Sequence, residues 1–99
     1  MSEEIKSMYF ITGYNIVTRS SRTWFYVLTE KEAREYVKAD SELIWEEEFD
    51  HCVVEELLPG YVDPVKIKEI WFKYNKEVGV YEEVDKPEQV KNICNFAIG

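Results

Sequence analysis

The only histidine of the chain, His51, stands next to Cys52, and this pair is the first place where side chains suited to chemistry meet. A histidine within reach of a cysteine can activate the thiol as a nucleophile. The surrounding letters, HCVVEELL, have strong β character, and neighbouring residues of a strand point to opposite faces of the sheet. We therefore expect that His51 and Cys52 do not meet and that both are ordinary packed side chains.

Other patterns of catalytic or ligand-binding chemistry are missing from the sequence. Two cysteines and one histidine do not form a four-ligand zinc pattern. The four glycines build no phosphate-binding loop, and no G-x-S-x-G elbow is present. We expect a protein that is not an enzyme and that carries no cofactor and no metal.

The acidic residues are concentrated in one part of the chain. Between Ala39 and Val65 there is no Lys or Arg, and nine of the 20 acids fall there. The remaining 11 acids face 12 bases, so the net charge of −8 arises within this window. Its members are Asp40, Glu42, Glu46, Glu47, Glu48, Asp50, Glu55, Glu56 and Asp63.

Three explanations of this acidic window stay open. Runs of like charge are usually solvated faces without a partner. Alternatively the acids form a binding surface for a basic protein, with Trp45 and Phe49 as aromatic anchors. Metal binding by the carboxylates is the third, although no D-x-D-x-D-G loop is present. The predicted partner-binding residues are Glu42, Trp45, Glu46, Glu47, Glu48, Phe49, Asp50, Glu55 and Glu56.

Length and composition place the chain among small globular domains. Its 99 residues predict one domain over residues 1–99, and 45% hydrophobic residues suffice for a core. No apolar run reaches the roughly 18 residues of a membrane span, and the acidic start is unlike a secretory signal. Two cysteines are too few for a disulfide framework, which favours a reducing, cytoplasmic location. The negative charge disfavours direct binding to nucleic acid or to an anionic membrane.

Apolar alternation and aromatic content predict a small, mostly antiparallel sheet. The letters KEVG between its last two strands predict a hairpin loop that ends in Gly79. Several aromatic residues alternate along these strands, so some of them face away from the core, where they are either shielded or form an interface. The predicted strands are 8–17, 23–28, 51–57, 68–75 and 80–84.

Two helices accompany this sheet in the prediction. The letters TEKE at 29–32 match a capping box that begins a helix over 30–39. Pro87 fits the first turn of a final helix. The resulting order, ββαβββα, predicts an α+β domain. The apolar stripe of the final helix consists of Val90, Ile93 and Cys94.

The segment 41–50 has two interpretations. A short helix from Ser41 would bring Trp45 and Phe49 together, because residues four apart share one face of a helix. A strand would instead place the aromatic side chains on one face and alternate acids on the other. The sequence alone leaves both open.

In size, in the placement of its charge and in the style of IWFKYNKEVGVYEEV and NICNFAIG, the chain resembles small phage-encoded anti-defence proteins of the anti-CRISPR and anti-restriction type. The resemblance is one of general character across the whole chain and contains no diagnostic motif. It implies an inhibitor whose carboxylates imitate the phosphates of DNA. The implied partner is a basic, nucleic-acid-binding surface of a bacterial nuclease complex in the host cytoplasm.

Two other functions use the same features of the sequence. A small acidic immunity protein would neutralise a basic toxin nuclease with the same combination of carboxylates and aromatic anchors. A structural or regulatory phage domain would need no partner for its acids, and it would form a homodimer through an exposed sheet edge.

Overall fold

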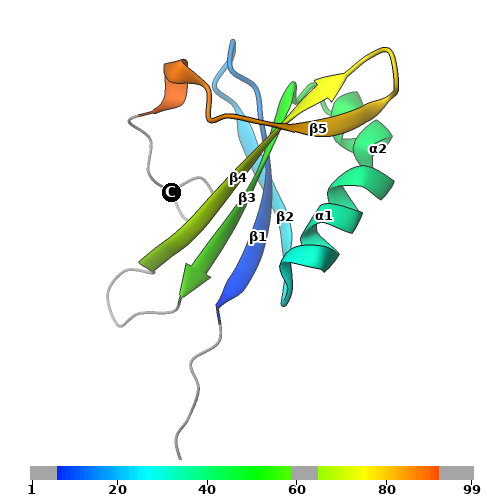
Figure 1. Cartoon of the computed structure of the whole chain (residues 1–99). Coiled ribbons are helices and arrows are strands. Elements are labelled where there is room, and N and C mark those ends of the chain that lie inside the picture. The colour runs from blue at the N-terminus through cyan, green and yellow to red at the C-terminus, as the bar shows by residue number, and fades with distance from the viewer. Residues whose placement is uncertain (1–6, 59–64, 92–99) are drawn as a thin grey trace, which may run out of the picture.

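The computed structural model describes residues 7–58 and 65–91, which form a five-stranded antiparallel sheet with two helices packed on one face (Figure 1). The strands lie in the order β2-β1-β3-β4-β5. This architecture confirms the predicted α+β class. The elements are β1 (Met8–Tyr14), β2 (Ser21–Val27), α1 (Glu30–Ala39), α2 (Ser41–Glu46), β3 (His51–Leu58), β4 (Val65–Asn75), β5 (Val80–Val84) and a 3-10 turn, η1 (Glu88–Val90).

Helix α1 has the bounds that its sequence predicts, because the signals that begin it are local. The Thr29 hydroxyl accepts a hydrogen bond from the Glu32 amide at 3.1 Å. The Glu32 carboxylate accepts from that same hydroxyl at 2.9 Å, where the capping box predicts a bond to the backbone. Ala33 and Val37 are buried against the sheet, which explains the apolar stripe of the helix.

The second helix of the described residues lies directly after the first. Residues 41–46 form α2. Of the two interpretations of segment 41–50, the helix is therefore correct for its first part. Ser41 is buried and joins three elements: its hydroxyl donates to the Val37 carbonyl at 2.5 Å and accepts from the Tyr81 amide at 3.2 Å. The contact with Tyr81 spans 40 residues of sequence, so a local pattern could not reveal it.

Several predicted bounds are wrong by a few residues. Strand β1 ends at Tyr14 and not at residue 17, because the Asn15 side chain accepts hydrogen bonds from the amides of Val17 and Thr18 and forms a turn. Strand β4 begins at Val65, three residues earlier than predicted. The region after Pro87 forms the 3-10 turn η1, and the rest of the predicted final helix, with Ile93 and Cys94, lies outside the described residues.

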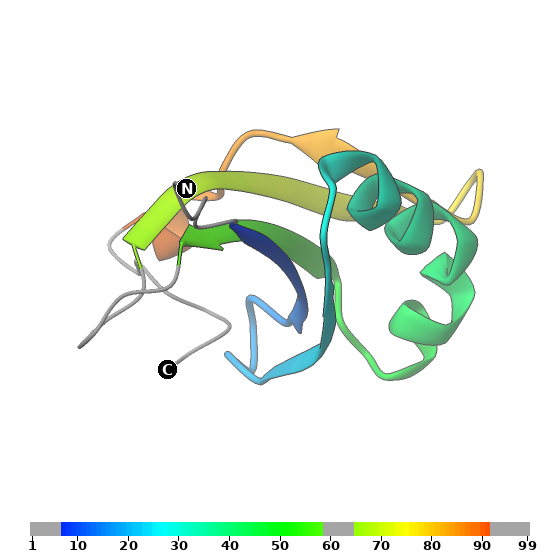
Figure 2. The same ribbon diagram turned by 90° about the horizontal axis from the view of Figure 1, so that it is seen from below.

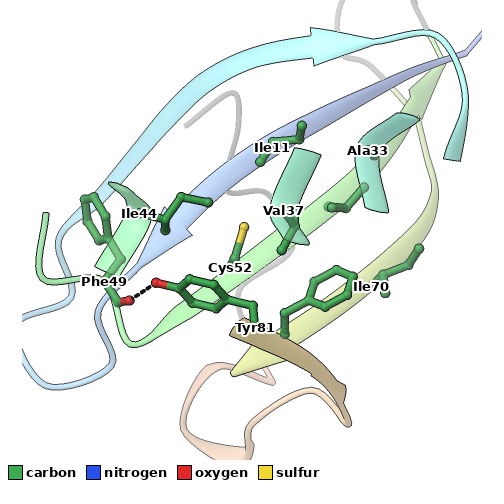
Figure 3. Packing of buried hydrophobic residues seen from close by; sticks show 10 residues of the cluster. Ile11, Ala33, Val37, Ile44, Phe49, Cys52, Ile70 and Tyr81 are labelled. Carbon is green, nitrogen blue, oxygen red and sulfur yellow. Dashed lines mark hydrogen bonds between the residues drawn. The ribbon is translucent and has the colours of Figure 1, made fainter. Parts of the chain in front are cut away.

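The main core lies between the sheet and the two helices (Figure 2, Figure 3). Cys52 and Val54 of β3 project into it, whereas Val53 faces the other side of the sheet. The Tyr81 hydroxyl donates to the Phe49 carbonyl inside this core. On the other face, Tyr14, Val53, Trp71 and Val90 form a second, smaller cluster, so both faces of the central strands are buried.

Gly13 leaves the space into which two aromatic rings of the main core pack. Trp24 is the extra residue of a β-bulge between β2 and β1, and its ring meets Phe49 edge to face with centroids 5.4 Å apart. A Cβ at Gly13 would lie 2.5 Å from Trp24 Cη2 and 2.7 Å from Phe49 Cδ2. Only glycine therefore fits beneath this pair.

We predict that Gly13→Ala destabilises the fold by about 1–3 kcal/mol, the usual cost of overpacking a dense core. Chemical denaturation followed by fluorescence measures this loss. In a Trp24→Phe background the contacting ring atoms of Trp24 are removed, so the same substitution should cost less. An equal cost in both backgrounds would contradict the proposed contact.

Candidate protein-binding surface

Four of the predicted partner-binding acids are exposed around helix α2 and the turn that follows it. Glu42 and Glu46 belong to α2, and Glu47 and Glu48 follow it. Of the four, only Glu47 has a basic partner among the residues that the structure describes, and its carboxylate accepts two hydrogen bonds from the Arg22 guanidinium at 2.7 and 2.9 Å. We refer to Glu42, Glu46, Glu47 and Glu48 as the acidic surface.

A hollow of about 520 Å³ lies beside this surface. Its backbone is held in place by polar contacts: the Asn15 side chain donates to the Glu48 carbonyl at 2.6 Å, and Asp50 accepts from the Ile16 amide at 3.1 Å. Glu48 has a positive φ of 67°, a conformation that L residues rarely adopt. The residues that line the hollow are Asn15, Trp45, Glu46, Glu48 and Asp50.

Trp45 is half-buried at this hollow and is supported by a neighbouring ring. Its indole stacks on Tyr74 with centroids 4.4 Å apart and planes 8° apart. The Lys76 ammonium lies 5.3 Å from the centroid of the indole. The stack ties α2 to β4, so the position of Trp45 is determined before any partner arrives.

Asp50 is half-buried and has an internal role. Its Oδ1 atom contacts His51 Nδ1 at 2.8 Å as well as the Ile16 amide. His51 is itself buried, with its ring edge-on to Trp71. Asp50 therefore borders the hollow while it holds the start of β3 in place.

The structure corrects the assignment of Phe49 and Glu55 to the predicted surface. Phe49 is 6% exposed and packs in the main core, and Glu55 is 0% exposed. Glu56 is half-buried and accepts a hydrogen bond from the Ser7 hydroxyl at 2.5 Å. Residues 55 and 56 alternate along β3, so they cannot present their carboxylates on one face.

Glu55 belongs to a network of charges on the face of the sheet opposite the helices. Lys66 Nζ lies 2.9 Å from the Glu55 carboxylate and 2.7 Å from that of Glu69. Lys86 also contacts Glu69, at 3.1 Å, and the Trp71 indole donates to it. Burial raises the pKa of Glu69, but the hydrogen bonds from Lys66, Trp71 and Lys86 outweigh it, and the pKa is lowered overall.

Burial and the charged neighbours shift the pKa of Lys66 in opposite directions. Desolvation lowers the pKa of the Lys66 ammonium, whereas hydrogen bonds to Glu69 and Glu55 raise it, and the net shift is upward. Lys66 and Glu69 therefore both stay charged at neutral pH. These acids stabilise the sheet and are distinct from the acidic surface.

The Cys52 thiol is fully buried in the main core, and burial raises its pKa far above the ordinary value. His51 faces the other side of the sheet, in contact with Trp71, as strand alternation predicts. Within residues 7–58 and 65–91, no group of three or more His, Cys, Asp or Glu side chains is arranged to hold a metal ion. No helix in these ranges is long and apolar enough to cross a membrane.

Sequence reasoning did not identify Asn15, Tyr74 or Lys76 as neighbours of the acidic surface. Each lies at least 29 residues away from its contact in the acidic segment. No local signal joins such distant residues, although an Asn in a turn cluster is typical of a residue that bonds to backbone. Comparison with protein-family models, curated proteins and solved structures finds no match for this chain.

We predict that Glu69→Gln lowers stability at neutral pH by about 1–3 kcal/mol, because the half-buried ammonium groups of Lys66 and Lys86 lose a charged partner. The folded pKa of Glu69 lies below its ordinary 4.5, so its ionised form contributes stability above that pH, which is lost as pH falls through the folded pKa. The variant should therefore lose less stability than the wild type on acidification between about pH 6 and about pH 3.

Denaturant titrations at several pH values measure this difference. Glu88→Gln is the matched control, because Glu88 is 85% exposed and its substitution removes the same charge. The control should follow the wild-type dependence on pH. Parallel pH curves for Glu69→Gln and the wild type would contradict the prediction.

Proposed function

We propose that this protein is a non-catalytic inhibitor whose acidic surface occupies a basic, nucleic-acid-binding surface of a bacterial defence nuclease complex, in the manner of phage-encoded anti-defence proteins. The observation that carries the proposal concerns three carboxylates. The side chains of Glu42, Glu46 and Glu48 are exposed and make no hydrogen bond or ion pair within the described part of the chain. Their charge is available to a partner.

Several other acids of the chain, in contrast, are paired with basic groups. Glu30, Glu47, Glu55, Glu69 and Glu83 each lie within 3 Å of a basic group. Clustered acids without such compensation repel one another, and solubility does not require them to be adjacent. A cationic partner would relieve this repulsion.

The geometry of the surface also suits an imitation of phosphates. Duplex DNA presents one charge per roughly 1.7 Å of helix axis, so a protein that binds it carries closely spaced Lys and Arg side chains. Glu46 and Glu48 border the same hollow, and Trp45 adds an aromatic wall beside them. Charged groups of this kind steer association and make it dependent on salt.

We predict that replacing Glu42, Glu46 and Glu48 together by Lys abolishes partner binding and leaves the fold intact, because all three side chains are exposed. Glu47 is left unchanged, since its ion pair with Arg22 joins the turn to β2. The matched control reverses Glu35, Asp85 and Glu88, which are exposed elsewhere and give the same change in net charge.

The measurement is capture of partners from bacterial lysate on tagged wild type, variant and control, followed by mass spectrometry. The proposal is supported if the wild type and the control both retain one basic protein in stoichiometric amount and the variant does not retain it. Duplex DNA should displace that protein, and so should high salt, because exposed charges are screened beyond about 8 Å at physiological ionic strength. Equal retention by the variant, or no competition by DNA, would contradict the proposal.

A further inference from the structure

The two outer strands of the sheet, β2 and β5, differ in how far they are protected against pairing. Strand β2 pairs only with β1, and β5 pairs only with β4, within the described residues. The outer edge of such a strand presents main-chain donors and acceptors to any extended partner. Natural proteins block these edges with charge, proline or short length.

The β4–β5 side of the sheet carries two of these protections, short length and charge. Strand β5 has five residues, and its exposed side chains include Glu82 and Glu83. The part of β4 that extends beyond β5 alternates charged residues, among them Lys66 and Lys68. The short strand and the charged side chains therefore disfavour pairing of another strand with this side of the sheet.

Strand β2 lacks most of this protection. Its sequence SRTWFYV contains one charge, Arg22, which is paired with Glu47. The adjacent helix α1 has three acids and three bases and is neutral overall. A second copy of the chain, although it carries a net charge of −8, meets little repulsion at this edge.

A row of two aromatic rings, one from β1 and one from β2, reaches the β2 edge. The rings of Phe10 and Tyr26, which are cross-strand partners, lie 5.7 Å apart. Tyr26 is 53% exposed, and Leu28, two residues further along, is 62% exposed. The bulge at Trp24 interrupts the regular strand, so the part suited to pairing begins at Phe25.

We propose that β2 pairs antiparallel with β2 of a second copy around a two-fold axis at Tyr26. Each Tyr26 then lies opposite its counterpart, and the row Phe10–Tyr26 continues into the second copy as four rings, an arrangement that cross-strand aromatic pairs favour. The occupant is a second copy because the pairing is self-complementary and nearly neutral. The paired segment is short, so the dimer is a weak one.

This dimer is independent of the proposed inhibition. Arg22, near the start of β2, contacts Glu47 of the acidic surface, whereas Tyr26 lies toward the end that leads into α1. Pairing at Tyr26 therefore leaves the acidic surface of each copy open. Each dimer presents two such surfaces.

Sedimentation equilibrium of the purified protein tests the proposal. Between about 10 µM and about 1 mM, the range of weak association, the average mass should rise from 11.8 kDa toward twice that value. Tyr26→Lys places like charges opposite each other and should weaken association about tenfold or more. Val84→Lys, an equal change of charge on β5, should associate like the wild type.

A cross-linking experiment tests the register and does not depend on the lysine variant. Directly opposite residues of an antiparallel pair lie about 4.5–5.5 Å apart at Cα, within the reach of a disulfide. In a Cys94→Ser background, Tyr26→Cys should form a covalent dimer under mild oxidation, and Val84→Cys should not. A wild type that stays monomeric at all concentrations, or equal cross-linking of the two cysteine variants, would overturn the proposal.

Discussion

The position of Phe49 is the constraint on which the rest of the structure depends. Its ring fills the space left by the missing side chain of Gly13 and meets Trp24 edge to face. Its carbonyl accepts a hydrogen bond from the Tyr81 hydroxyl. Phe49 therefore connects the inner strand β1, the outer strand β2 and the distant strand β5. Because Phe49 directly follows Glu48, this packing also determines where the exposed acids lie.

The same segment shows how burial separates acids with different roles. A carboxylate taken out of water needs compensation by cations and hydrogen bonds, or its charged form is lost. Glu55 and Glu69 have that compensation from Lys66, and Glu69 also from Lys86. The exposed acids of α2, Glu42 and Glu46, have no basic partner within the described residues, and their charge is solvated by water. A basic partner can therefore reach them.

Local signals in the sequence were sufficient to predict helix α1, the loop that ends at Gly79 and the strand β3. The sequence did not decide between helix and strand for α2. The buried Ser41 of this helix contacts Val37 and also Tyr81, which is 40 residues away in sequence. The alternation of β3 already implies that Glu55 and Glu56 face opposite sides. Which side is covered depends on Lys66 of β4 and on Lys86, which lies 17 residues from its partner Glu69.

The two proposed contacts, at the acidic surface and at the β2 edge, would rest on different interactions. Association through exposed charges is fast, long-ranged and weakened by salt. Association through main-chain hydrogen bonds and aromatic contacts is short-ranged and changes little with salt. The exposed acids lie around α2, whereas the side chains near Tyr26 are neutral. Two copies of the chain therefore repel each other most where their acidic surfaces approach and least where their β2 edges approach. If the protein dimerises as proposed, this charge distribution would direct the contact away from the surface that a basic partner would occupy.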